Sequence, residues 1–188
     1  MLSVFETQEI LVLELELMRG GYMLDVLAET GCLAESKAAV LMTELVESIP
    51  FFRQQGVAHR DVKLSNLALN APLTPDNPIE DDELTLVLIS GKHEAYSNMV
   101  DMFSAGVVLY TILCGYEPFY GLTDKELVPA NKTGVFEFHD PEWTLLLADA
   151  KDLVLKTMAR NKNEGIKPAE ALKHPFLREK AQKLKYIR

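Results

Sequence analysis

One polar segment of the sequence, His59-Arg60-Asp61-Val62-Lys63-Leu64-Ser65-Asn66, carries the side chains best suited to chemistry. The string fixes five positions, and chance produces such a string in on the order of one chain in ten thousand of this size. An aspartate, a lysine and an asparagine at this spacing are typical of phosphoryl transfer, which depends on groups that position a phosphate and a hydroxyl. The alternative is a turn in which Asp61 and Asn66 only cap backbone groups.

The neighbouring segments predict that this string lies on a loop between a helix and a strand. Residues 35–55 carry apolar side chains at three-to-four spacing, which predicts an amphipathic helix closed by Gly56. Pro50 lies inside this helix and removes a backbone hydrogen bond, so we expect a kink or a local unwinding there. Residues 57–70 read as loop and short strand.

The rest of the chain predicts a small piece of sheet followed by a helical bundle. Two strands are expected at 4–6 and 10–18, and the alternation Leu13-Glu14-Leu15-Glu16-Leu17 in the second predicts one buried face. The other expected elements, in chain order, are a helix at 22–29 closed by Gly31, a polar loop at 71–83, a strand at 84–89, a helix buried on all sides at 100–114, and helices at 148–160 and at 168–172, the last beginning with Pro168.

Composition limits the class of protein and its partners. The 188 residues, 48% hydrophobic and 25% charged, suit one globular domain, and the net charge of −9 gives no general attraction for nucleic acid or anionic lipid. The spacing of Cys32 and Cys114 fits neither a disulfide framework nor a zinc site, so two free thiols are expected. With no signal peptide at the start and no apolar stretch long enough to cross a membrane, we expect a cytoplasmic or nuclear protein.

The segment 59–66 resembles the catalytic loop of a serine/threonine protein kinase, and the likeness covers nearly the whole chain. Residues 16–21 resemble the kinase hinge, and residues 100–106 resemble the start of its buried central helix. Further motifs follow in family order and are most similar to the calcium/calmodulin-dependent protein kinase group: Cys114 to Phe119, Phe136 to Phe138, Pro141 to Trp143, Ala150 to Leu153 and Ala171 to Phe176. The resemblance implies a protein kinase-like α+β fold, of which this chain is mostly the α-helical C-lobe: 1–18 as a remnant of N-lobe strands and hinge, and 19–188 as a partial C-lobe.

The resemblance also implies roles for five site residues. Asp61 orients the substrate hydroxyl and accepts its proton, Lys63 contacts the transferred phosphate, and Asn66 holds Mg²⁺. The Glu16 carbonyl and the Met18 amide are expected to bind the adenine ring of ATP. ATP and Mg²⁺ are therefore the cofactors that the family implies.

Three other residues are expected to be structural. In the family, the aspartate matched by Asp101 bonds back to the catalytic-loop backbone. His174 is expected to pack in the closing motif rather than bind a ligand, and Trp143 is expected in the core.

Several parts of a kinase are missing from the sequence. The first glycine and the first lysine, Gly20 and Lys37, both follow the strand that leads into the hinge, so no glycine-rich loop or strand lysine is expected. Ile89-Ser90-Gly91 stands where relatives have a magnesium-binding Asp-Phe-Gly, and isoleucine cannot bind a hard cation. The nine residues 92–100 are too few for an activation segment. Gly165 stands where relatives have the arginine that pairs with the glutamate of Ala-Pro-Glu, so both partners are lost together.

These observations predict a serine/threonine protein kinase-family domain that is inactive or very weakly active as written. The alternatives are a non-catalytic, pseudokinase-like scaffold and a truncated kinase fragment. A protein partner is expected to cover the surface that the missing N-lobe leaves apolar. The basic tail 178–188 is either a calmodulin target or the last helix of the lobe.

Overall fold

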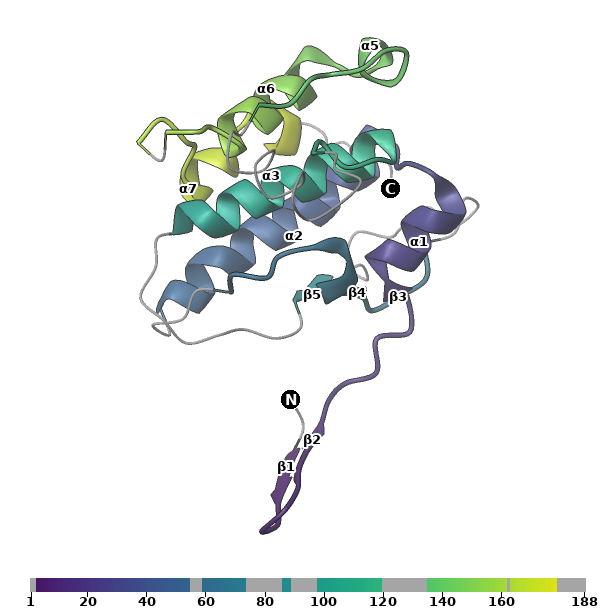
Figure 1. Ribbon diagram of the computed structural model, residues 1–188, viewed down its shortest axis with the longest axis vertical. Coiled ribbons are helices and arrows are strands. Elements are labelled where there is room, and N and C mark those ends of the chain that lie inside the picture. Colours follow the sequence, from purple (N-terminus) through teal and green to yellow (C-terminus); the bar gives the residue numbers. More distant parts are fainter. Residues whose placement is uncertain are drawn as a thin grey trace.

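The computed structural model describes residues 3–54, 59–73, 86–88, 98–119, 135–161 and 163–178. Its body is built on three helices: α2 (Glu35–Gln54), α3 (Asn98–Cys114) and α6 (Ala148–Thr157). In Figure 1, α2 and α3 lie side by side, and α6 packs on the other flank of α3. Two helices of one turn, α5 (Glu142–Leu145) and α7 (Pro168–Ala171), complete this part, and Pro168 begins α7 as expected.

A small antiparallel sheet lies beside the helices. Its strands run in the order β3 (Gly21–Tyr22), β4 (Leu67–Leu69) and β5 (Leu86–Leu88). The one-turn helix η1 (Leu64–Asn66) leads directly into β4, and α1 (Met23–Thr30) follows β3. Gly31 ends α1 with a φ of 77°, a left-handed conformation that glycine adopts without steric cost.

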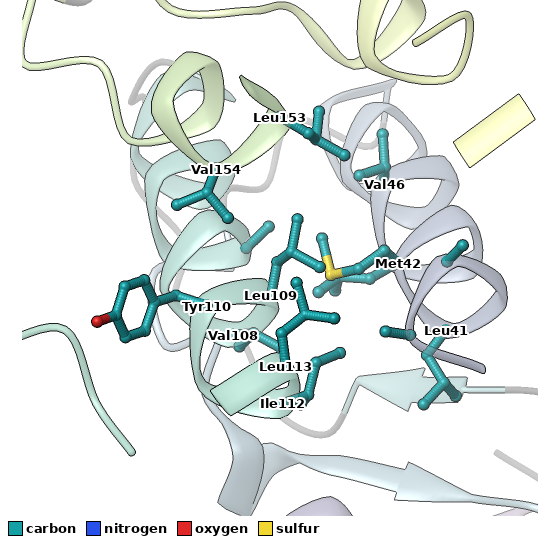
Figure 2. Packing of buried hydrophobic residues seen from close by; sticks show 14 of the residues in the cluster. Leu41, Met42, Val46, Val108, Leu109, Tyr110, Ile112, Leu113, Leu153 and Val154 are labelled. Carbon is teal, nitrogen blue, oxygen red and sulfur yellow. The ribbon is translucent and has the colours of Figure 1, made fainter. Parts of the chain in front are cut away.

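The core forms where α3 meets its two neighbours. Figure 2 shows side chains of α2 and α6 pointing toward those of α3, with Leu41, Met42 and Val46 on the α2 side and Leu153 and Val154 on the α6 side. Close approach to α6 depends on Gly106, because a Cβ there would lie 2.5 Å from both Met158 Cγ and Thr157 Oγ1. The expectation of a buried helix is confirmed for most of α3, although Val100 in its first turn is exposed.

A separate hairpin projects from this body. Strands β1 (Ser3–Glu6) and β2 (Leu11–Glu14) pair with each other and extend away from the helices (Figure 1). The expectation of a second strand reaching residue 18 with one buried face is wrong, because β2 ends at Glu14 and all four of its residues are exposed. Alternation shows which side chains share a face, but in the described part of the chain nothing covers either face.

Most other expected elements are confirmed within one to three residues at each end. Helix α2 continues through Pro50, so the alternative of local unwinding is wrong, while the kink stays a prediction. Both cysteines are free, Cys32 exposed and Cys114 buried. Gly56, the loop from 74 onward and the tail after 178 lie outside the described residues. No helix in the described ranges combines the length and the apolar character that a membrane span requires.

Candidate functional site

The three expected catalytic residues meet on the loop between α2 and β4. Lys63 Nζ lies 2.9 Å from Asp61 Oδ1. Asn66 Nδ2 donates to Asp61 Oδ2 at 2.7 Å and to the Asp61 carbonyl at 2.8 Å. The one-turn helix η1 makes these contacts possible, since it folds the chain back so that Asn66 faces Asp61.

These contacts set the charge of Asp61. The hydrogen bond from Lys63 has the largest effect on the Asp61 carboxyl and lowers its pKa. Burial opposes this, and the hydrogen bond from the Asn66 amide lowers the pKa further. Asp61 is therefore ionised at neutral pH. About half of its side chain is exposed, so an incoming hydroxyl can reach the carboxylate and donate a hydrogen bond to it.

Helix α3 fixes the backbone of this loop through the side chain of Asp101. Asp101, buried in the first turn of α3, accepts hydrogen bonds from the backbone N–H of Arg60 at 2.8 Å and of His59 at 3.1 Å. Arg60 has a φ of 62°, a left-handed conformation that is unfavourable for a residue with a side chain. Two bonds to one buried carboxylate hold it there, which confirms the structural role expected for Asp101.

The sequence analysis assigned no role to His59, whose side chain is buried against the loop. Its ring packs 5.7 Å from the ring of Phe52, between centroids, and its Nδ1 accepts the Asp61 N–H at 3.3 Å. In the neutral ring Nδ1 is thus the acceptor and the proton is on Nε2. Burial lowers the pKa of His59, against the opposing charges of Asp101 and Asp61. The sequence signal that could have pointed to His59 was its position in the segment 59–66, two residues before Asp61.

The expected adenine-binding groups lie on the extended segment that joins the hairpin to the body. Gly20 N–H donates to the Leu69 carbonyl at 2.8 Å, which ties this segment to β4 and so to the loop that precedes it. The approach is close, since a Cβ on Gly20 would lie 2.2 Å from the carbonyl oxygen of Ala71. Within the described ranges, the carbonyl of Glu16 and the N–H of Met18 bond to no other backbone group. An adenine edge needs one donor and one acceptor of this kind.

Few of the described side chains at this site could bind a metal ion. Because the Asn66 nitrogen points at Asp61, its Oδ1 remains as an acceptor, and Mg²⁺ often takes only one or two protein oxygens beside waters and phosphates. The described parts of the chain hold no group of three His, Cys, Asp or Glu residues that could bind a metal. The segment Ile89-Ser90-Gly91 lies outside them. The metal role of Asn66 therefore stays a prediction.

The structural residues of the lobe lie where they were expected. Trp143 is fully buried. His174 is buried, with its Nε2 2.8 Å from Asp152 Oδ2 and its Nδ1 accepting the Phe176 N–H at 3.3 Å. Hydrogen bonds from Lys156 and then from His174 lower the pKa of Asp152. His174 thus packs within the lobe, with both ring nitrogens in hydrogen bonds.

Gly165 has an unexpected neighbour. A Cβ on Gly165 would lie 2.2 Å from the terminal methyl carbon of Met99, at the start of α3. Met99 thus fills the space that a side chain at position 165 would occupy. Position 165 was expected to lack the arginine of relatives, and an apolar side chain of α3 packs there instead.

Comparison with known proteins agrees with this geometry. The family model described as "Protein kinase domain" matches residues 1–74 and 85–177. The chain is 30% identical over 195 residues to calcium/calmodulin-dependent protein kinase type 1 of Macrobrachium nipponense, covering 94% of this chain and 56% of that protein. It is 30% identical over 201 residues to human calcium/calmodulin-dependent protein kinase type IV, with coverage of 95% and 42%. It is 29% identical over 202 residues to calcium-dependent protein kinase 3 of Plasmodium berghei, with coverage of 96% and 36%.

The chain belongs to the protein kinase domain family, with an α+β kinase-like fold that is mainly C-lobe. Within the family it is a serine/threonine kinase domain of the calcium/calmodulin-dependent group. It spans about half or less of the length of most of the curated relatives it matches, between 34% and 56%. The division into residues 1–18 and 19–188 stays a prediction.

Proposed function

We propose that this chain carries the phosphoryl-transfer loop of a serine/threonine kinase, with Asp61, Lys63 and Asn66 in the roles that the family resemblance implies. The observation that carries the proposal is the contact set around Asp61, with Lys63 on one carboxylate oxygen and Asn66 on the other. The ionised Asp61 carboxylate orients a serine or threonine hydroxyl and accepts its proton as the phosphoryl group leaves ATP. Lys63, next to it, neutralises charge on the transferred group.

ATP and Mg²⁺ are the cofactors we propose for this site. The Glu16 carbonyl and the Met18 N–H would bind the adenine edge, and the Oδ1 of Asn66 would be a ligand of Mg²⁺. When bound, Mg²⁺ supplies charge neutralisation of the phosphates. We propose that the activity of this polypeptide by itself is absent or very weak, because positioning dominates phosphoryl transfer and the chain lacks the lysine and glycine loop that position ATP.

The second candidate is a non-catalytic scaffold, and one observation favours it. Met99 fills the space at Gly165, so the lobe is packed without the arginine that anchors the substrate platform in relatives. In this proposal a protein partner covers the exposed apolar surface near the N-terminal end. Regulation by calmodulin is a weaker proposal, motivated by relatives whose names state dependence on calcium and calmodulin.

A nucleotide titration tests the first proposal against the second. A fluorescent ATP analogue is titrated into the chain with and without Mg²⁺, and phosphate transfer to a serine peptide is then followed by mass spectrometry. We expect saturable, Mg²⁺-dependent binding that Asn66→Ala weakens, and a trace of transfer that Asp61→Asn removes. The matched control is Asp25→Asn, an exposed carboxylate on α1, which should change neither. If the chain melts cooperatively but shows no saturable nucleotide binding, the first proposal is contradicted and the non-catalytic scaffold is supported.

A further inference from the structure

Two leucines at the turn from α5 into α6 lie in solvent. Leu145 is 84% exposed, more than any other large apolar side chain that the structure describes, and Leu147 is 49% exposed. The backbone between them is extended, and the intervening Leu146 packs against the core. Leu145 and Leu147 therefore form a small outward-facing apolar surface, here called the 145–147 surface. Figure 1 shows it next to α5, at the opposite end of the molecule from the hairpin.

The backbone of the 145–147 surface is held by two hydrogen bonds. The Leu147 N–H donates to Glu35 Oε1 at 3.0 Å, from the first residue of α2. The Leu147 carbonyl accepts the Ala150 N–H at 3.1 Å, in the first turn of α6. Because these bonds fix the segment before a partner arrives, binding would have to order little of the chain, which favours association.

The same two bonds indicate which kind of secondary structure a partner would present. Addition of a strand requires backbone N–H and carbonyl groups that can pair with it. In Leu147 both groups are already bonded. A partner would therefore contact the leucine side chains, and an amphipathic helix presents a continuous row of apolar side chains for such a contact.

Charge indicates which residues would flank that row. Between residues 135 and 150 the chain has no lysine or arginine but has four carboxylates: Glu137, Asp140, Glu142 and Asp149. Glu142 lies three residues before Leu145, so the two share a face of α5, and Asp149 follows Leu147 in the first turn of α6. A helix that covers the leucines lies beside these carboxylates, which favours lysine or arginine at its flanks. A second copy of the chain would bring like charges together, which disfavours self-association.

We infer that the 145–147 surface, with Glu142 and Asp149 beside it, is a docking site for an amphipathic helix of a partner polypeptide in which lysine or arginine flanks an apolar stripe. The leucines supply the apolar contact, and the carboxylates select the basic side chains. The site shares no residue with the loop that carries Asp61, so it does not depend on the proposed catalysis.

A synthetic helix tests this inference on the full chain. The probe is a fluorescein-labelled peptide of about 18 residues, long enough to form a helix, with leucine along one face and lysine on the other. Fluorescence anisotropy should show saturable binding. Leu145→Ala should raise the Kd about tenfold, because the truncated side chain has less apolar area to bury. Leu24→Ala, at an exposed leucine of α1, should leave the Kd almost unchanged.

A second pair of variants tests the role of charge. Glu142→Gln should raise the Kd about threefold, the effect of losing one exposed ion pair near the upper end of its range, and should weaken the dependence of the Kd on salt concentration. Glu47→Gln, the same change at an exposed position of α2, should alter neither the Kd nor its salt dependence.

Four results would overturn the inference. Equal binding by a peptide of the same composition in shuffled order would show general charge attraction without an apolar stripe. Equal effects of Leu145→Ala and Leu24→Ala would show that the peptide binds elsewhere. No saturable binding by a chain that melts cooperatively would show that the surface accepts no such helix. Binding that appears only after deletion of residues 179–188 would show that the basic tail of the chain is the occupant.

Discussion

The buried carboxylate of Asp101 accepts the backbone N–H of Arg60, 41 residues earlier in the chain, at 2.8 Å. This contact joins the most buried helix of the body to the loop that carries Asp61. Arg60 is held in a left-handed conformation, so the loop has a shape that its own residues would not prefer. The position of Asp61 therefore depends on a residue that touches no substrate.

Replacing Asp101 tests this dependence. Asp101→Ala leaves the N–H groups of His59 and Arg60 without their acceptor, and we expect the free energy of unfolding to fall by about 2–4 kcal/mol. Urea denaturation followed by circular dichroism measures this. Asp25→Ala, at an exposed position on α1, should change stability by no more than about 1 kcal/mol. An equally small effect of Asp101→Ala would mean that other contacts hold the loop.

His59 should make the folded protein sensitive to mild acid. Because burial lowers the pKa of His59 below its ordinary value of 6.5, the unfolded chain binds more protons than the folded chain between these two values. Stability should thus decrease as the pH falls below about 6.5, since protonation of His59 favours the unfolded chain. Thermal melts between neutral pH and pH ~5 should show a steeper loss for the wild type than for His59→Gln. His139→Gln, at an exposed histidine, should keep the wild-type slope.

The contact between Met99 and Gly165 predicts non-additive substitutions. Gly165→Ala forces the Met99 methyl to move, so we expect a cost of about 1 kcal/mol in the free energy of unfolding. In a Met99→Ala background the space is free, and the same substitution should be nearly neutral. A double-mutant cycle from urea denaturation gives the coupling energy. Additive effects would contradict the packing described at this position.

Pro50 offers a substitution that should stabilise the fold. It lies within the continuous helix α2 and cannot donate to the carbonyl of Val46, one turn earlier. Pro50→Ala restores that donor, and we expect the free energy of unfolding to rise by about 1–3 kcal/mol. Glu47→Ala in the same turn, an exposed position, should stay within about 0.5 kcal/mol of the wild type. A loss of stability in Pro50→Ala would show that the proline ring has packing contacts worth more than the hydrogen bond.

The helices and the loop that carries Asp61 were predictable because their signals are local. The apolar spacing of residues 35–55 and the glycine at position 31 predicted α2 and the end of α1 to within one residue. The string around Asp61 brings three polar side chains within six residues of one another, and in the structure these side chains are in contact. The link from Asp101 to the loop came from family resemblance, because no local pattern joins residues 41 positions apart.

The remaining features depend on what surrounds each element. The alternation in β2 predicted a buried face, but burial requires a neighbour, and the described part of the chain provides none. The packing of Met99 over Gly165 could not be foreseen, because it depends on how the start of α3 lies against a distant turn. For His59, burial lowers the pKa, and burial cannot be read from sequence.

The close contact between Gly20 and β4 also determines how the projecting hairpin can move relative to the body. The Gly20 N–H is hydrogen-bonded to the Leu69 carbonyl, and Gly20 lies too close to Leu69 and Ala71 to carry a Cβ, so this point of the chain is held against the body. Swinging of the hairpin relative to the body must therefore arise from torsions in residues 15–19. Residues 15–19 include Glu16 and Met18, the segment proposed to hold adenine, so a change in the orientation of the hairpin would alter the position of those two groups.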